Sequence, residues 1–267
     1  MELLNLNNHA EKGLIKNKSS IKLRNLIVII LFYLIHFQSF SQGNYERIRI
    51  SGDLELIELT NNAYVHVSYT NSPQYGRVGS NGLIFINNNE AFLFDTPMTD
   101  SLTQALVEWL RDSMQLKITG FVPNHWHVDC MGGLSYLQSQ NIESYANQLT
   151  IDIAKSKNLP VPDHGFKDSL DLYLGDRIIK CYYPGAAHSL DNIVVWIPSE
   201  KILFAGCMIK SMNSRNIGNT ADGDLALYPK TIDYLMYKFP DAKVVIPGHG
   251  QPGGIELIEH TKSLIEN

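Results

Sequence analysis

Residues 117–133 read KITGFVPNHWHVDCMGG, an apolar run followed at once by a cluster of polar side chains. The run at 117–122 predicts a β-strand, and the cluster after it holds an H-x-H-x-D motif formed by His125, His127 and Asp129. Composition alone would produce such a motif about 0.02 times in a chain of this length. Imidazole and carboxylate groups are zinc ligands, so the motif predicts a metal site, on a continued strand or in a tight loop. The alternative is a polar loop with incidental histidines.

Three more candidate ligands each follow a β-like run: His188 in PGAAH, Cys207 in KILFAGC and His249 in IPGHG. A lone buried cysteine is usually a small apolar residue, and a lone histidine is often a hydrogen-bonded loop residue. Taken with the H-x-H-x-D motif, however, the six donors suit two zinc ions with three protein ligands each. Three ligands leave a coordination position open, which is typical of catalytic rather than structural zinc.

Strand-like and helix-like segments alternate around these donors, without an internal linker. Two sheets packed face to face, with helices outside, would bury the strands, so we expect an α/β (α+β) fold. We also expect Asp100 to cap the helix whose face carries Leu102, Leu106 and Leu110. Strands are expected at 47–50, 55–59, 63–69, 82–86, 91–95, 117–122, near 144 and at 243–246, with three or four between 173 and 208. Helices are expected from 133 and at 149–157, 228–238 and 255–265.

The N-terminal segment predicts export. Ten apolar residues, LIVIILFYLI at 26–35, follow Lys22 and Arg24 and precede a Ser-Phe-Ser sequence at 39–41. A bilayer span needs about 20 apolar residues, whereas a basic start, a short apolar core and a small-x-small end describe a secretory signal peptide. We expect 1–41 to be the signal peptide, cleaved after Ser41, and 42–267 to be one mature domain. The alternative is a buried core segment.

Composition excludes several classes of protein. With 44% hydrophobic and 18% charged residues among 267, the chain is globular rather than disordered. The net charge is −5, and no long basic run is present, so a nucleic-acid partner is not expected. The leader holds five of the 22 basic and two of the 27 acidic residues, which leaves 17 and 25, a net −8, on the mature domain. Three cysteines cannot all pair within one chain.

From about residue 47 to 265 the sequence resembles the metallo-β-lactamases, specifically the broad-spectrum di-zinc subclass of class B and its chromosomal carbapenemase branch. The matching stretches are PNHWHVDCMGGL (123–134), SYANQLTIDIAK (144–155), LPVPDHGF (159–166), CYYPGAAH (181–188), DNIVVWIP (191–198), ILFAGCMIK (202–210), GNTADGDL (218–225) and VVIPGHG (244–250). The resemblance implies an αββα sandwich with the metals at the sheet edges.

The same resemblance implies the reaction and the setting. A metal-bound hydroxide would hydrolyse the β-lactam amide bond of penicillins, cephalosporins and carbapenems and so confer antibiotic resistance. The partner would be a small-molecule β-lactam, with no nucleic acid and no membrane after signal cleavage. The expected location is the periplasm and the expected state a monomer.

Residue roles follow from the resemblance. His125, His127 and His188 would hold the first zinc, and Asp129, Cys207 and His249 the second, so that Asp129 belongs to the catalytic centre. Lys210 would bind the substrate carboxylate, Asn219 would bind substrate and help to polarise the lactam carbonyl, and Asp95 would orient a ligand. The ordinary alternatives are a solvated lysine at 210 and a Gly-Asn turn at 218–219. His66, His164 and His260 match no ligand position.

Cys130 separates this chain from other hydrolases of the same fold. Many thioester and lactone hydrolases carry H-x-H-x-D-H, whereas here Cys130 takes the last position. This substitution favours a lactamase over a thioester or lactone hydrolase; a non-catalytic zinc-binding protein is the other alternative. Cys130 and Cys207 are expected to lie close enough to oxidise when zinc is removed.

Two departures from the family pattern concern loops near the site. Ala186 and Ala187 stand where relatives often have glycines, and alanine tolerates a positive φ poorly. We therefore expect a somewhat different path for the loop before His188. In the flap-like segment 71–79 the only large aromatic is Tyr75, where close relatives carry tryptophan.

Overall fold

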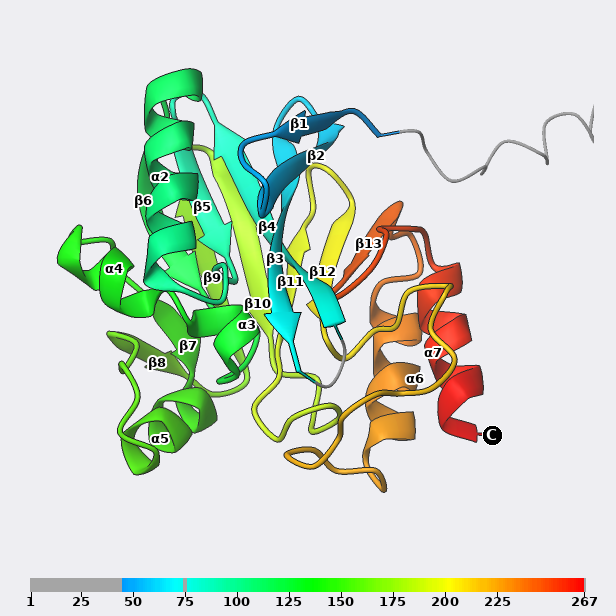
Figure 1. Ribbon diagram of the computed structural model, residues 1–267. Coiled ribbons are helices and arrows are strands. Elements are labelled where there is room, and N and C mark those ends of the chain that lie inside the picture. Colours follow the sequence, from blue (N-terminus) through cyan, green and yellow to red (C-terminus); the bar gives the residue numbers. More distant parts are fainter. Residues whose placement is uncertain (1–44, 74–75, 267) are drawn as a thin grey trace, which may run out of the picture. The chain divides into compact units, whose positions relative to one another are not determined.

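Two β-sheets face each other in the computed structural model, which describes residues 45–73 and 76–266 (Figure 1). The first sheet has its strands in chain order, antiparallel except for the parallel pair β5–β6. These strands are β1 (Arg47–Arg49), β2 (Leu54–Thr60), β3 (Ala63–Ser72), β4 (Gly76–Asn87), β5 (Glu90–Phe94) and β6 (Lys117–Val122).

The second sheet has the order β13-β12-β11-β10-β9 and is antiparallel except for the parallel pair β12–β13. Its strands are β9 (Ser169–Leu174), β10 (Arg177–Tyr182), β11 (Val194–Ile197), β12 (Ile202–Gly206) and β13 (Val244–Pro247). A short parallel pair, β7 (Tyr145–Asn147) and β8 (His164–Phe166), lies beside the first sheet, where Phe121 of β6 bridges to Ser144.

Helices cover the outer face of each sheet, as Figure 1 shows. The chain forms α2 (Asp100–Met114), α3 (Val128–Met131), α4 (Leu134–Ser139), α5 (Gln148–Ser156), α6 (Tyr228–Lys238) and α7 (Glu256–Glu266). α2 and α4 pack on the first sheet, and α6 and α7 pack on the second. The predicted αββα sandwich is therefore confirmed.

The alternation of strand side chains builds this arrangement. On β3, Val65 and Val67 belong to the core between the sheets, whereas Tyr64 packs with the helices outside. β12 is buried throughout because it is covered on both faces: Phe204 joins the inner core, and Leu203 and Ala205 face α6 and α7. Continuous apolar runs such as ILFAG are expected of strands covered on both faces.

Several boundaries differ from the prediction. Thr99, not Asp100, caps α2: its hydroxyl accepts a hydrogen bond from the Leu102 amide at 3.3 Å, and Asp100 is the first helical residue. β4 begins six residues earlier than expected because it pairs with β3 along the whole hairpin. α3 and β8 were not predicted.

Two predictions lie outside the described residues: the signal peptide at 1–41 and the role of Tyr75. Within the described part of the chain, no helix is both long and apolar enough to span a membrane.

Candidate metal centre

The H-x-H-x-D motif occupies a turn between β6 and α3. His125 and His127 lie in the loop after β6, and Asp129 lies in the first turn of α3, whose N-cap is His127. Of the two conformations left open by the sequence, the structure has the loop. The change from loop to helix within three residues lets donors at alternate positions converge on one region.

The remaining donors come from the second sheet. His188 lies in the β10–β11 connection, Cys207 directly follows β12, and His249 follows β13. Gly206, just before Cys207, has φ +58, and a Cβ there would lie 2.4 Å from the Asn124 side chain. Only glycine permits this close approach between the end of β12 and the loop after β6.

Three imidazoles form the first cluster, which we call the histidine cluster: His125, His127 and His188. Their ring centroids lie 4.5–5.3 Å apart, with the rings close to perpendicular. His125 Nε2 and His127 Nδ1 are 2.8 Å apart. Nδ1 of the buried His188 has no hydrogen-bond partner among the described residues. Nitrogens that face one another and a buried nitrogen without a partner fit a bound cation.

Burial keeps two members of the histidine cluster, His125 and His188, neutral. Loss of hydration lowers the pKa of His188 to about 3, and the neighbouring positive charges of Lys210 and His127 act in the same direction. The pKa of His125 is also lowered, first by burial and then by the charge of His188. Neutral imidazole is the form that binds a metal ion, so these histidines are prepared for coordination.

Asp129, Cys207 and His249 form the second cluster, which we call the thiolate cluster. The Asp129 carboxylate lies 3.2 Å from His249 Nε2 and 3.4 Å from Cys207 Sγ, and Cys207 Sγ lies 3.4 Å from His249 Nε2. Zinc–ligand bonds of 2.0–2.3 Å in a tetrahedron place neighbouring donors about 3.3–3.8 Å apart. The three separations lie within about 0.1 Å of this range and are therefore compatible with one zinc ion.

Charges in the thiolate cluster stabilise one another. A hydrogen bond from the Cys130 thiol, together with His249, lowers the pKa of Cys207 to about 6 against the opposing effect of burial. Burial alone would lower the pKa of His249, but Cys207 and Asp129 raise it well above its usual value. Burial would likewise raise the pKa of Asp129, yet the hydrogen bond from His249 and the nearby histidine charges hold it low.

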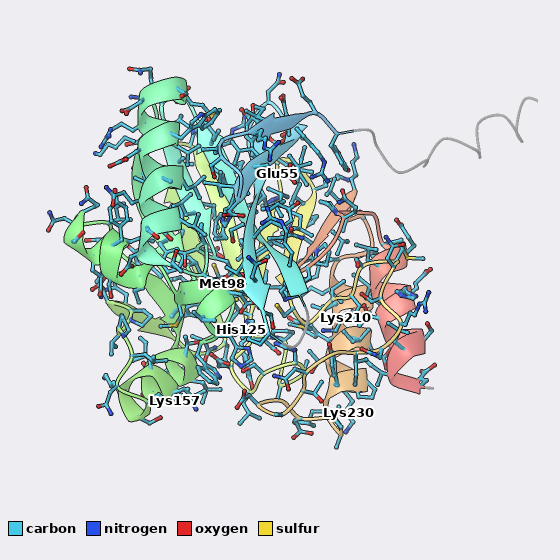
Figure 2. All side chains as sticks on the ribbon, in the orientation of Figure 1. Glu55, Met98, His125, Lys157, Lys210 and Lys230 are labelled. Carbon is cyan, nitrogen blue, oxygen red and sulfur yellow. The ribbon has the colours of Figure 1, made fainter. Side chains whose placement is uncertain are left out.

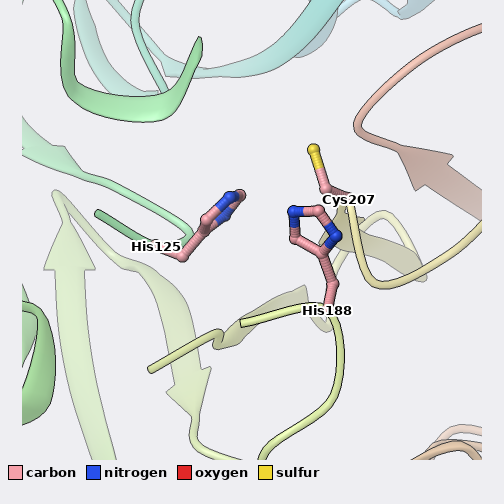
Figure 3. A group of neighbouring side chains, drawn as sticks. All are labelled: His125, His188 and Cys207. Carbon is pink, nitrogen blue, oxygen red and sulfur yellow. The ribbon is translucent and has the colours of Figure 1, made fainter. Parts of the chain in front are cut away.

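The two clusters adjoin. Donor atoms of His125, His188 and Cys207 lie within 4.8 Å of one another, and Figure 3 shows these three side chains pointing toward a common space. Five of the six side chains proposed as ligands from the sequence thus fall in groups of three close donors among the described residues, and the sixth, His127, contacts His125 but belongs to no such group.

Asp95 lies directly behind the histidine loop. One of its carboxylate oxygens accepts a hydrogen bond from the Asn124 backbone amide at 2.5 Å, and burial raises the pKa of Asp95 well above its usual value. Asn124 in turn donates to the carbonyl of Ile193, the residue before β11, and its Oδ1 lies 3.2 Å from His125 Nδ1. Asp95 therefore acts on His125 through Asn124 rather than by direct contact.

The two residues predicted to bind substrate lie in different settings. Lys210 is half-buried at the same end of the sheets as His125 (Figure 2), and its Nζ donates a hydrogen bond to the Cys207 carbonyl at 2.6 Å. Asn219 is exposed, and its Oδ1 accepts from the Ala221 amide at 3.1 Å. This Asx turn uses the acceptor end of the Asn219 amide, whereas polarising a carbonyl requires the donor end.

Sequence analysis missed two carboxylates that hold this centre together. Asp222 lies 3.0 Å from His127 Nε2. The buried Asp191 accepts hydrogen bonds from the Trp126 amide, the Thr150 hydroxyl and the Ser189 hydroxyl, so it ties the histidine loop to the loop after His188. Both lie in stretches quoted for the family resemblance, but neither has a diagnostic spacing to a ligand.

The loop before His188 needs no positive φ at its alanines. Gly185 has φ +120, whereas Ala186 and Ala187 are not among the residues with positive φ, and both are buried. The alanines are thus accommodated without strain from a positive φ.

The other three histidines of the described residues lie apart from both clusters. His66 Nε2 lies 3.0 Å from the Asp95 carbonyl, and His260 Nε2 lies 3.0 Å from the Ser214 carbonyl. His164 is exposed on β8. None of the three belongs to a group of potential metal ligands among the described residues.

An αββα sandwich with N, O and S donors gathered at one end of its sheets is the arrangement expected of a metal-dependent hydrolase, in which a catalytic metal keeps an open position. Residues 75–249 match the model of the metallo-beta-lactamase superfamily. The chain belongs to this family, as the resemblance predicted.

Individual relatives agree with this assignment. A metallo-beta-lactamase type 2 from Bacteroides fragilis is 52% identical over 218 residues, covering 82% of this chain and 88% of the relative. A metallo-beta-lactamase type 2 from Pseudomonas aeruginosa is 35% identical and covers 78% of this chain and 83% of its own. The solved structure of a metallo-beta-lactamase from Pontibacter korlensis has a TM-score of 0.77 at 36% identity, covering 80% of this chain and 99% of that one.

Proposed function

We propose that this chain is a zinc-dependent β-lactamase that hydrolyses the amide bond of penicillins, cephalosporins and carbapenems and thereby confers antibiotic resistance. The observation that carries the proposal is the convergence of the histidine cluster and the thiolate cluster in a chain 52% identical to a metallo-beta-lactamase type 2. Membership of the metallo-β-lactamase family implies metal-dependent hydrolysis.

Each cluster would hold one zinc ion, two per chain. His125, His127 and His188 would hold the first, and Asp129, Cys207 and His249 the second. Bound zinc supplies Lewis acidity and lowers the pKa of water toward 7. Three neutral imidazoles leave a site with the full charge of the ion, whereas one carboxylate and one thiolate bring the other site near neutrality.

The chain's own groups would orient the substrate. The Lys210 ammonium would pair with the carboxylate beside the lactam ring, and the Asn219 amide would donate a hydrogen bond to the lactam carbonyl. For Asn219 this requires the side chain to exchange its Asx-turn bond, or to use its free NH₂ end.

Asp129 is the carboxylate placed for proton handling. Its low pKa keeps it anionic at neutral pH, and its carboxylate lies within 4.8 Å of a donor atom of His125 as well as of Cys207 and His249. Hydrolysis adds water across the C–N bond, so the carbonyl carbon gains oxygen and the ring nitrogen gains a proton. An anionic carboxylate near the ring nitrogen of the bound substrate would orient the water that donates this proton.

We propose further that the chain is exported to the periplasm as a monomer after loss of residues 1–41. The rival functions are thioester or lactone hydrolysis by the same fold and zinc binding without catalysis. Cys130 stands where the motif of those hydrolases has its last histidine ligand, which argues against the first rival, and sites with three donors argue against the second.

One set of assays tests the function. Purified protein is mixed with imipenem and with nitrocefin, with and without a zinc chelator, and the loss of lactam absorbance is followed. We expect turnover of both compounds, abolished by chelator and restored by added zinc, with two zinc ions bound per chain. Turnover of a thioester but of neither lactam would replace this proposal with the first rival.

A further inference from the structure

Trp126 stands between two of the proposed zinc ligands, His125 and His127, and supplies no ligand atom itself. Its partly buried indole packs against the core outside the first sheet. The indole also meets the His127 imidazole, with the ring centroids 4.5 Å apart and the ring planes inclined at 73°. An edge-to-face contact of this kind favours one relative orientation of the two rings. The indole therefore restricts how the His127 ring can turn.

A cation lies over the same indole. Lys157, the C-cap of α5, places its Nζ 4.2 Å from the centroid of the Trp126 ring (Figure 2). A cation at this distance is attracted by the negative face of an aromatic ring. The side chain is otherwise exposed, and within the described part of the chain no ion pair includes Lys157. The indole is thus the group that holds the ammonium, and the ammonium in turn restrains the indole.

One buried carboxylate fixes both sides of this contact. Asp191 Oδ2 accepts a hydrogen bond from the Trp126 backbone amide at 2.9 Å and another from the Thr150 hydroxyl of α5 at 2.7 Å. Asp191 is fully buried, and the low dielectric of the interior strengthens both bonds. The helix that ends at Lys157 is therefore held in place against the loop that carries Trp126.

His127 is the member of the histidine cluster that depends most on such support. Its side chain is 16% exposed, whereas His125 and His188 are buried. It also belongs to none of the groups of three close donors among the described residues. Its Nδ1 faces His125 Nε2 at 2.8 Å, and its Nε2 lies 3.0 Å from Asp222. Turning of the ring would move Nδ1 away from the other donors of the cluster.

We propose that Trp126 is a positioning residue for His127 and that Lys157, over the indole, completes this support. Together they set the direction of His127 Nδ1 and hence the metal affinity of the histidine cluster. Among the described residues neither side chain has a hydrogen bond, ion pair or ring contact with the thiolate cluster, so that cluster should not respond to their removal. The inference rests on the proposed function for the metal site and adds two residues that bind no metal.

Stepwise cobalt binding to the full chain tests the proposal, because the thiolate cluster serves as an internal reference. Zinc-free protein is titrated with Co(II) against a competing chelator, and the thiolate-to-cobalt band of Cys207 is followed together with the d–d bands. We expect Trp126→Leu to weaken metal binding at the histidine cluster by about 2- to 12-fold. We expect Lys157→Ala to weaken it by about 2- to 5-fold. The band of Cys207 should keep its wild-type affinity in both variants.

Conservative variants separate positioning from a general loss of structure. Trp126→Phe keeps an aromatic ring and Lys157→Arg keeps a cation, so each should retain most of the wild-type affinity at the histidine cluster. Lys155→Ala is the matched control, since Lys155 is an exposed lysine in the last turn of the same helix.

The outcomes distinguish this inference from the proposed function. Wild-type protein that binds no metal at the histidine cluster would overturn both. Wild-type affinity at this cluster in Trp126→Leu, or an equal loss at the two clusters, would overturn the positioning role and leave the proposed function intact. An affinity in Lys157→Ala equal to that in Lys155→Ala would show that the cation over the indole does not contribute.

Discussion

The histidine cluster and the thiolate cluster adjoin each other, yet they hold charge in opposite ways. In the histidine cluster, burial disfavours protonation and lowers the pKa values of His125 and His188. In the thiolate cluster, the anions of Asp129 and Cys207 raise the pKa of His249. Two of the three histidines in the first cluster are therefore buried and neutral, whereas the second cluster is a network of ion pairs.

The difference follows from the segments of the chain that supply each of the two adjoining clusters. The histidine loop follows β6 of the first sheet, and the connection between β10 and β11 of the second sheet brings His188 to it. The thiolate cluster combines α3 with the ends of β12 and β13, so its charged groups come from both halves. A metal ion would keep its charge in the first of the proposed sites and would be largely neutralised by Asp129 and Cys207 in the second.

Removal of the Cys207 thiolate should have the largest effect, and it should affect the thiolate cluster but not the histidine cluster. We expect Cys207→Ser to bind one zinc ion instead of two, because a neutral hydroxyl cannot replace a thiolate as a zinc ligand. The histidine cluster should stay filled, and β-lactam turnover should fall more than in any other variant considered below. Zinc content after dialysis at controlled free zinc measures the change, with Cys181→Ser as control. A Cys207→Ser protein that retains two tightly bound zinc ions would contradict the division into clusters.

His66 isolates the effect of burial, since it lies outside both clusters. Burial lowers its pKa from 6.5 to about 4. The unfolded chain therefore takes up a proton below pH 6.5 that the folded chain refuses until pH 4, so stability falls as the pH drops between these values. The full loss is about 3 kcal/mol.

Urea unfolding of the zinc-free chain at pH 7 and pH 4 measures this effect. As the pH falls, the stability of His66→Gln relative to wild type should rise by up to about 3 kcal/mol. His260→Gln is the control, because His260 lies on α7 away from both clusters. An unchanged difference between His66→Gln and wild type at the two pH values would show that His66 is protonated in the folded chain.

The part of the site predicted from sequence consists of residues whose local context is diagnostic. His125, His127 and Asp129 form a compact motif, and Cys207 and His249 directly follow apolar strands. The fold class followed from the same alternation of apolar runs and polar ends. The ends of neighbouring strands lie together at one edge of a sheet. Polar residues that directly follow apolar strands are therefore expected to lie close to one another.

The residues that sequence analysis missed act through long-range contacts. Asp222 meets His127 across 95 residues, and Asp191 meets Trp126 across 65. No short-range spacing records such a contact. Thr99 and Asp100 both suit an N-cap, and only the path of the chain decides between them. α3 and β8, with four and three residues, are too short for periodicity to reveal.

Lys210 links the thiolate cluster to substrate. Loss of a charge-assisted hydrogen bond of about 1.5–3 kcal/mol predicts a roughly 10- to 150-fold fall in kcat/KM for Lys210→Ala. The loss should appear mainly in KM, whereas Lys210→Arg should keep much of the activity and Lys210→Glu should be worse. A neutral ester of the same lactam should respond little to the three changes.

Zinc content must accompany these kinetics, because Lys210 Nζ also donates to the Cys207 carbonyl. Lys262→Ala, which removes an exposed ion pair with Asp233, is the control for a general change of charge. If Lys210→Ala and wild type hydrolyse a carbapenem with equal kcat/KM, Lys210 does not bind the substrate carboxylate and another cation must do so.

Substitution of Asp222 should have the smallest and most selective effect, because its side chain contacts His127 of the histidine cluster and no member of the thiolate cluster among the described residues. It accepts a hydrogen bond from His127 Nε2, the ring nitrogen opposite the one facing His125. A carboxylate in this position fixes the tautomer of a metal-binding histidine and increases its basicity. Asp222→Asn should therefore weaken zinc at the histidine cluster by about 10- to 100-fold while leaving the thiolate cluster unchanged.

The two clusters should then exchange their order of filling. In the wild type we expect the histidine cluster to bind zinc more tightly, so a limiting zinc ion occupies it first. In Asp222→Asn the first ion should enter the thiolate cluster, where cobalt substitution gives a thiolate-to-metal charge-transfer band that reports Cys207 directly. Asp233→Asn, which alters only the exposed pair with Lys262, should retain the wild-type order. If the band appears with the same equivalent of cobalt in Asp222→Asn and wild type, the carboxylate of Asp222 does not set the affinity of the histidine cluster, and burial of the three imidazoles alone accounts for it.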